Sequence, residues 1–205
     1  MTRMIANARN RLSEHWHNKT TNWSNRRFHS FSSPDHSNAF CAAKDWLQDT
    51  AETLCDHRTK GFAPDPIPRY LEFLGVMQAL FLQQDAIRQL FYSLGLPTEA
   101  FGEYSKKPEW TLLRNLRNLT AGHPTAKSYR SRNGVAGRIV IGRDGIQSYN
   151  HVSFALFDDI DFLLPGGKPA RRHNTVSLAE VIDAYDLVGA EAIDTCTDAL
   201  LIQLK

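Results

Sequence analysis

The chain has 205 residues, of which 42% are hydrophobic and 22% are charged, and a chain of this kind can build one good core. Its formal net charge of +2 singles out no class of partner. The longest apolar stretch, near residues 73–82, is interrupted by Gln78 and is too short to cross a bilayer. Because the N-terminus also lacks the apolar core of a signal peptide, we expect a cytoplasmic protein without membrane contact.

The N-terminal segment, residues 1–36, is rich in Arg, Asn, Ser and His, and its aromatic residues have no regular spacing. It holds six Lys or Arg residues but only two Asp or Glu residues. We expect a basic, poorly packed arm with one short helix, followed by a single helical domain over residues 37–205. The histidines of the arm do not have the spacing of zinc ligands, so no metal site is expected.

Two long helices are predicted to follow the arm. Over residues 38–57, apolar residues recur at spacings of three and four, as on one face of a helix. A second helix begins at Pro66 or Pro68 and ends at Leu94. Its sustained apolar stripe is typical of the central helix of a bundle.

One turn of this second helix is polar. Gln84 stands where the stripe calls for an apolar residue, and Gln83 and Asp85 flank it. The turn is either exposed to solvent, or it forms a polar patch that supports a functional site from inside the bundle. Gln84 and Asp85 are therefore candidate supporting residues.

The rest of the chain predicts further helices and a small β insertion. A helix over residues 98–104 precedes one that starts at Pro108 and ends near Gly122. An Asp-Gly pair at 144–145 predicts a hairpin, which with a further strand spans about 138–157.

A loop rich in Pro, Gly and Arg is expected over residues 164–174. The Ser-x-x-Glu capping box at 177–180 then opens a last helix that runs to about residue 204.

The most informative residues stand near the end of the helix that starts at Pro108, where the sequence reads Arg117-Asn118-Leu-Thr-Ala-Gly-His123-Pro. Arg offers a fork of donors for phosphate, His exchanges protons near neutral pH, and Asn can orient either group. In one continuous helix Arg117 and His123 would point ~240° apart, so we expect a break at Gly122 or a helix boundary within the motif. Arg117, Asn118 and His123 are candidate catalytic residues for metal-free phosphodiester chemistry.

This trio lies in the basic part of the chain. Residues 106–143 hold nine Lys or Arg residues and one Glu, whereas residues 144–205 hold four basic and ten acidic residues. A basic block suits a polyanion, although a solvated face balanced by nearby acidic helices is the alternative. The candidate RNA-binding side chains are Arg114, Lys127, Arg130 and Arg132. Glycine-rich nucleotide loops and zinc-protease motifs are absent from the sequence, so no cofactor is expected.

An Arg, a polar residue and then a His at a helix end resemble the signature of the HEPN superfamily. Here Asn118 follows Arg117, and five residues separate Arg117 from His123. The long preceding helix with its polar turn is also similar to that family, over roughly residues 38–126. The resemblance implies a mainly α fold: an HEPN-like helical bundle with a small β-hairpin insertion before the C-terminal helix.

The resemblance also implies a function. In active members of the family, two Arg/His sets face each other across the twofold axis of a homodimer and form a metal-independent endoribonuclease site. The chain would then be a toxin or phage-defence effector that cuts RNA, with an antitoxin or regulatory partner. The family also contains members that bind RNA, nucleotides or proteins without cutting, and such a non-catalytic module is the alternative function.

The chemistry can be written from the residues alone. Cleavage by the 2′-OH of RNA needs a base, an acid for the leaving 5′-oxygen and a cation near the phosphorane. The two His123 side chains of a dimer supply base and acid, Arg117 stabilises the charge, and Asn118 orients His123 or a phosphate oxygen. The structural alternative is that Arg117 pairs with an acidic residue and His123 caps the carbonyls of its helix.

Overall fold

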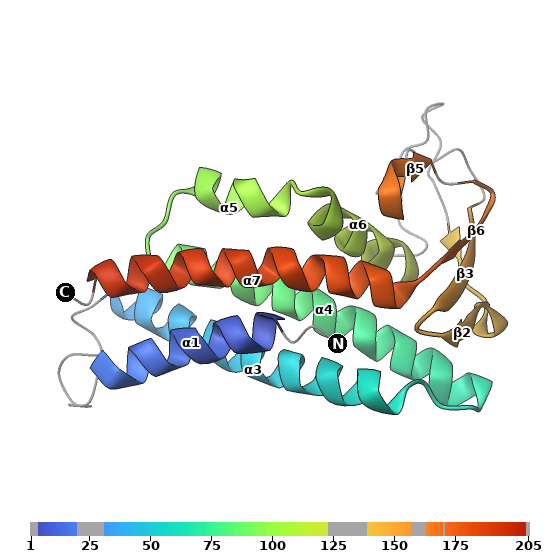
Figure 1. Ribbon diagram of the computed structural model, residues 1–205, viewed down its shortest axis with the longest axis horizontal. Helices are drawn as coiled ribbons and strands as arrows, with labels where there is room; N and C mark the ends of the chain where they lie inside the picture. The colour runs from blue at the N-terminus through green and yellow to red at the C-terminus, as the bar shows by residue number, and fades with distance from the viewer. Residues whose placement is uncertain (1–3, 20–30, 123–138, 157–162, 170, 204–205) are drawn as a thin grey trace. The chain divides into compact units, whose positions relative to one another are not determined.

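The computed structural model of the protein describes residues 4–19, 31–122, 139–156, 163–169 and 171–203. Within these described residues six α-helices predominate, and a small antiparallel sheet precedes the last helix (Figure 1). The expected mainly α fold with a β insertion before the C-terminal helix is therefore confirmed. The chain divides into two compact units, and each is built from separated stretches of sequence.

The first unit comprises residues 1–55, 82–110 and 186–205, and its described part is helical. The helices that it contains wholly or in part are α1 (Met4–Lys19), α3 (Pro34–Lys60), α4 (Pro66–Ser93), α5 (Thr98–Ser105), α6 (Pro108–Arg117) and α7 (Leu178–Gln203). In Figure 1, α7 runs between α1 and α5. Arg11 of α1 forms an ion pair with Asp194 of α7 at 2.7 Å, and Tyr104 of α5 shares a hydrogen bond with Thr195 of α7 at 2.6 Å.

The N-terminal segment is better packed than its composition predicts. Residues 4–19 form α1, and the first N–H groups of this helix donate to the carboxylate of Asp186, which satisfies donors that have no partner within the helix. The buried apolar residues of α1 are Ile5, Ala8, Leu12 and Trp16. Their spacing of three and four places them on one face. The poor packing expected here is wrong for residues 4–19, and the division into an arm and a domain at residue 36 stays a prediction.

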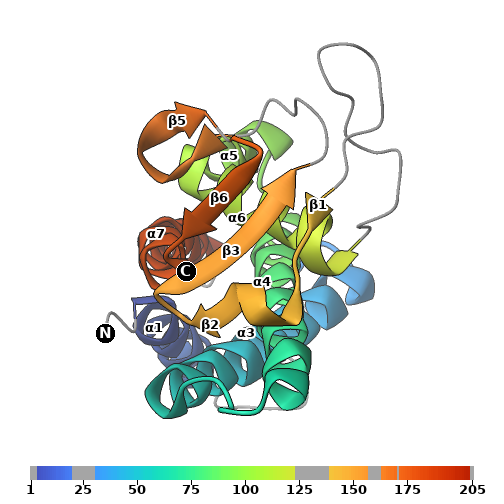
Figure 2. The same ribbon diagram turned by 90° about the vertical axis from the view of Figure 1, so that its right-hand side faces the viewer.

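The second unit comprises residues 56–81 and 111–185 and contains the sheet. The strands are β1 (Ile139–Val140), β2 (Ile146–Ser148), β3 (His151–Leu156), β4 (Leu163–Leu164), β5 (Lys168–Pro169) and β6 (His173–Val176). In Figure 2, β3 is central, with β1 and β2 along one edge and β6 along the other, and all pairings are antiparallel. A separate pair is formed by β4 and β5.

The predicted hairpin at 144–145 is wrong in its pairing. Residues 143–145 form a 3-10 turn, and the strands on either side of it, β1 and β2, pair with β3 rather than with each other. Gly145 is required at this turn for another reason, since a Cβ there would collide with the carbonyl oxygen of Ser153. The loop expected over 164–174 instead contains β5 and the start of β6, whereas Gly166 and Gly167 lie in the 3-10 turn before β5, where both have positive φ.

The helices lie where the apolar spacing predicts them. α3 is longer than its predicted range by a few residues at each end. The bounds of α4 and α5 agree closely with the ranges predicted for each of them. The N-cap bond of the predicted capping box is present, because the Glu180 N–H donates to Ser177 Oγ at 3.2 Å at the start of α7. Among the described helices, none combines the length and the apolar character that a membrane span needs.

Candidate functional site

The helix that starts at Pro108 changes its geometry inside the predicted motif. α6 (Pro108–Arg117) ends at Arg117, and η1 (Asn118–Gly122), a π-helical turn, follows directly. Thr120 Oγ1 donates to the Leu116 carbonyl oxygen at 2.7 Å, and this buried side chain occupies an acceptor of the helical ladder. The α-helix therefore ends within the motif, between Arg117 and Asn118, and a π turn continues it to Gly122. The expected break at Gly122 stays a prediction, because the residues that follow it are not described. Short π turns are rare and occur often at functional sites.

Three side chains hold Arg117. Nη1 donates to Asn118 Oδ1 at 3.1 Å, and Nη2 donates to Gln78 Oε1 at 2.9 Å. The guanidinium carbon lies 3.8 Å from the centre of the Phe81 ring. Gln78 and Phe81 stand three residues apart on α4 and therefore share one face of that helix. Both of these acceptors are neutral amide oxygens, so they orient the guanidinium without adding a negative charge.

Arg114 brings a second guanidinium to the same ring. Its guanidinium carbon lies 4.5 Å from the centre of the Phe81 ring. Arg114 and Arg117 are three residues apart on α6, so both side chains leave the same side of the helix. A cation over an aromatic face is attracted by the ring quadrupole, by about 0.5–1 kcal/mol at exposed sites. We call Gln78, Phe81, Arg114, Arg117 and Asn118 the Phe81 cluster.

The structure brings together part of the predicted site. Three of the predicted residues, Arg114, Arg117 and Asn118, meet in the Phe81 cluster. Four others lie outside the described residues, and their position relative to Arg117 stays a prediction: His123, Lys127, Arg130 and Arg132. Gln84 and Asp85 belong to the first unit, whereas the cluster belongs to the second.

The polar turn of α4 is not the exposed turn that one interpretation predicted. Gln84 is only 1% exposed, and its Nε2 donates to the Trp110 carbonyl oxygen at 3.0 Å. Gln83 is also buried and donates to Thr50 Oγ1 at 3.4 Å. Within the part of the chain that the structure describes, Gln84 Oε1 is buried without a hydrogen-bond partner. The contacts of Gln84 tie α4 to α6, and its support of Arg117 stays a prediction.

Sequence reasoning missed Gln78 and Phe81 as site residues. Gln78 drew notice only because it interrupts an apolar stretch, and Phe81 falls in the stripe that predicts the bundle core. Their spacing of three on one helix was the available signal. This spacing could not show that the two residues contact α6, because the sequence does not say which turn of α4 lies beside Arg117.

A second polar cluster in the same unit is formed by His57, Arg58, Glu72, Tyr149 and Asp183, and we call it the Arg58 cluster. The two Nη atoms of Arg58 donate to the two carboxylate oxygens of Asp183 at 2.5 and 2.7 Å. The Tyr149 hydroxyl lies 2.5 Å from His57 Nδ1, and His57 Nε2 lies 3.8 Å from the Glu72 carboxylate.

The electrostatics of the Arg58 cluster keep its phenol protonated. Burial raises the pKa of Tyr149 well above its usual value, although the positive charge of Arg58 acts in the opposite direction. The protonated phenol shares a hydrogen bond with His57 Nδ1. Because Tyr149 is buried and its backbone carbonyl accepts from the Ala179 N–H at 2.9 Å, the cluster fastens the sheet to the start of α7.

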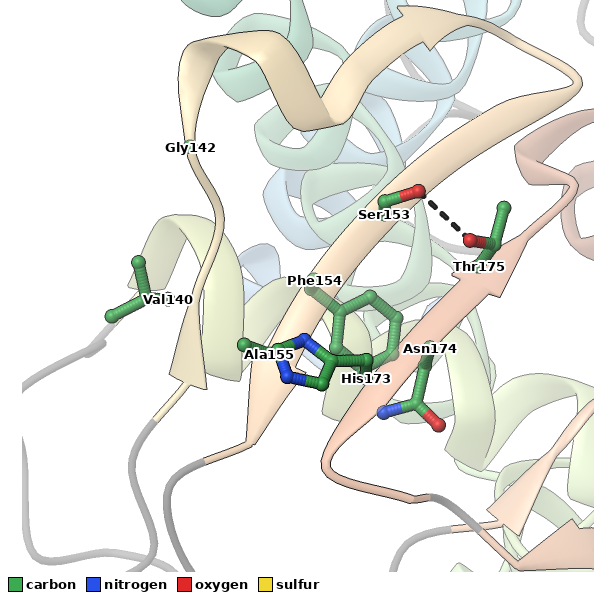
Figure 3. A pocket seen from close by; sticks show the side chains of 8 residues that line it. All are labelled: Val140, Gly142, Ser153, Phe154, Ala155, His173, Asn174 and Thr175. Carbon is green, nitrogen blue, oxygen red and sulfur yellow. Dashed lines mark hydrogen bonds between the residues drawn. The ribbon is translucent and has the colours of Figure 1, made fainter.

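A shallow pocket of about 430 Å³ lies on the outward face of the sheet, over β1, β3 and β6 (Figure 3). Side chains alternate along β3, so Ser153 faces this pocket while its neighbour Phe154 is buried. The hydroxyls of Ser153 and Thr175 are joined at 2.8 Å, and the Asn174 amide bonds the backbone of Arg171. No Lys or Arg is among its described lining residues, so it lacks the phosphate donors of the Phe81 cluster.

Comparison with known proteins gives no family for this chain. No family model, curated protein or solved structure matches it significantly. The residues around Arg117 are therefore the strongest indication of what the protein does.

Proposed function

We propose that the protein is a metal-independent endoribonuclease with an HEPN-like helical fold, in which Arg117, Asn118 and His123 act at one RNA phosphate. The observation that carries this proposal is the way in which Arg117 is held, by Gln78, Asn118 and Phe81, where α6 meets the π turn. A guanidinium oriented by amides and a ring is ready for the charge that develops on a phosphorane. Such preorganisation requires no rearrangement at the moment of reaction.

In this mechanism RNA supplies its own nucleophile. One His123 takes the proton of the 2′-OH, and the 2′-oxygen attacks phosphorus. The 5′-oxygen then leaves with a proton from a second His123, which gives a 2′,3′-cyclic phosphate and a 5′-OH. Arg117 donates to the non-bridging oxygens, and the amide nitrogen of Asn118 orients a phosphate oxygen or His123. No step in this sequence calls for a metal ion.

The proposal includes a homodimer in the cytoplasm. Each chain contributes one His123, whereas the reaction needs an acid and a base at the same time. A toxin or phage-defence effector, held in check by an antitoxin or regulatory partner, is the biological role that we propose for such an enzyme. Sedimentation as a clean monomer at micromolar concentration would exclude the shared site.

Incubation of the purified protein with labelled RNA in excess EDTA tests the activity. We expect shortened RNA with 2′,3′-cyclic phosphate and 5′-OH ends, while DNA of the same sequence stays intact. The Arg117→Ala variant, purified in the same way, controls for a contaminating ribonuclease. Cleavage that EDTA abolishes, or that leaves 5′-phosphates, would indicate a metal nuclease. Binding of RNA without cleavage would replace the enzyme with the non-catalytic RNA-binding module.

A further inference from the structure

Phe81 of α4 is distinguished by its contacts with two cations rather than by its burial. The ring is half-buried, as are Tyr70 and Leu74 on the same helix, whereas Phe73 is 0% exposed. The Phe81 ring carries the guanidinium carbons of Arg117 and Arg114 at 3.8 and 4.5 Å from its centre.

These distances place both cations over the face of the ring. At the ring edge, the ring's own atoms would keep a carbon farther from the centre. The π face is the negative part of an aromatic ring, and Arg is the cation most often found there. Because both guanidinium carbons lie within 4.5 Å of the same ring centre, the two positive charges are close to each other.

We propose that Phe81 is a positioning residue, which holds Arg114 and Arg117 as one two-pronged clamp on the phosphate backbone of RNA. The identity of the anion rests on the proposed function, whereas the clamp itself rests on the contacts around the ring. Gln78, on the same face of α4, fixes one edge of the Arg117 guanidinium. No part of this role requires Phe81 to touch the RNA.

The chemistry of the two groups fits a phosphodiester. Its two non-bridging oxygens accept hydrogen bonds from guanidinium forks, often in pairs. A guanidinium has five N–H donors, so it can bind two amide oxygens and a phosphate at the same time. A long Arg side chain loses much of its rotamer freedom when it is fixed. Contacts that fix Arg114 and Arg117 before RNA arrives reduce that loss on binding.

The test measures binding of a 2′-O-methyl RNA oligonucleotide, which cannot be cut through its own 2′-oxygen. Phe81→Leu removes the π face and keeps an apolar side chain. Pentafluorophenylalanine at position 81 keeps the shape of the ring and reverses the charge of its face, so it serves if the Leu variant folds poorly. Phe101→Leu is the matched control, because Phe101 is also half-buried but contacts Phe91 and Trp110 rather than a cation.

We expect either change at position 81 to weaken binding roughly five- to thirtyfold, the scale of two lost cation–π contacts. Phe81→Trp should bind within about twofold of the wild type, since Trp offers the best face for a cation. Phe101→Leu should also stay within about twofold. In an Arg114→Ala, Arg117→Ala background, the change at position 81 should have no further effect, because a positioning residue acts only through its arginines.

Two results would overturn the clamp. One is wild-type binding by the pentafluorophenylalanine protein, and the other is an equal loss in the background without the two arginines, which would show a packing role. The proposed enzymatic activity can be contradicted without contradicting the clamp. If the wild type never cuts ordinary RNA but its binding of the 2′-O-methyl RNA still depends on Phe81, the clamp stands and the catalytic function is wrong.

Discussion

The Arg58 cluster and the Phe81 cluster belong to the same unit, and each is centred on a half-buried arginine. Arg58 gives two short hydrogen bonds to the carboxylate of Asp183. Arg117 gives one hydrogen bond to each of two amides and lies over a ring. Burial alone does not distinguish these two arginines, but the chemistry of the groups that hold them does.

The difference has a direct consequence for binding. A phosphate that approached Arg58 would compete with a carboxylate already matched to its fork. The described groups that orient Arg117 are two amides and a ring, and none of these carries a negative charge that would compete with a phosphate. We therefore expect Arg58 to govern stability and Arg117 to govern RNA binding and cleavage.

The largest expected effect is that of His123→Ala on cleavage. Loss of the general acid and base should slow RNA cutting by roughly a hundredfold or more. Binding of the 2′-O-methyl RNA should stay close to wild type, because the arginines of the Phe81 cluster remain. Single-turnover cleavage and fluorescence anisotropy measure the two quantities. An equal loss in both would mean that His123 binds or folds rather than transfers protons.

Arg117→Ala should separate the two clusters most clearly. Loss of a group that stabilises the phosphorane should slow cleavage by about 10²–10³-fold. It should also weaken binding and lower the slope of log K against log salt by about one, since one phosphate contact is lost. Arg58→Ala is the matched control and should leave the salt slope unchanged. A lower slope for Arg58→Ala would break the comparison.

Arg58→Ala should act on stability instead. It removes two charge-assisted hydrogen bonds and leaves the Asp183 carboxylate without this partner, so the free energy of unfolding should fall by about 1–3 kcal/mol. Urea denaturation of the single variants and of Arg58→Ala with Asp183→Ala measures the coupling between the two residues. Arg117→Ala should change the urea midpoint less than Arg58→Ala, and the reverse order would contradict the assignment.

The loss of stability at alkaline pH should also come from the Arg58 cluster, through Tyr149. The pKa of Tyr149 is raised in the folded state, so this contribution is complete below the unfolded value of 10.0 and is lost as pH rises above it. The free energy of unfolding should then fall by about 1.4 kcal/mol per pH unit from this group. Urea titrations across that range should show the slope in the wild type and not in Tyr149→Phe.

Tyr92 provides the control for this titration. A hydrogen bond to Asp35 raises the pKa of this exposed phenol in the first unit. Tyr92→Phe should keep the alkaline slope that Tyr149→Phe loses. A slope that survives in Tyr149→Phe would assign the alkaline loss to other groups.

The sequence predicts the helices well and the sheet poorly, for a physical reason. The spacing of apolar residues that predicts α3 and α4 is local, and burial of that face needs no particular partner. Strand pairing depends on partners elsewhere in the chain. The Asp-Gly pair at 144–145 is a hairpin signal, yet β1 and β2 each find β3, and Gly145 is needed because Ser153 lies against it.

The same reasoning explains what could be predicted of the site. Arg117 and Asn118 follow from a motif near one helix end, although the sequence did not predict that the helix changes type between these two residues. Gln78 and Phe81 belong to another helix, and only the packing of α4 against α6 shows that they hold Arg117. Residues of a site that come from one segment can be found by pattern, whereas their supports from a second segment require the fold.

The smallest expected effect is that of Gln84→Met, which tests whether every amide of α4 near this region has the same role. Gln84 loses one hydrogen bond to the Trp110 carbonyl, at about 1 kcal/mol, but a buried oxygen without a described partner is removed with it. The two effects oppose each other, so the free energy of unfolding should change by less than about 1 kcal/mol. Gln78→Met removes an acceptor of Arg117 and should therefore slow cleavage more than Gln84→Met does. If Gln84→Met slows cleavage as much or more at unchanged stability, the buried turn supports Arg117 through α6, and the division between the two units does not separate their functions.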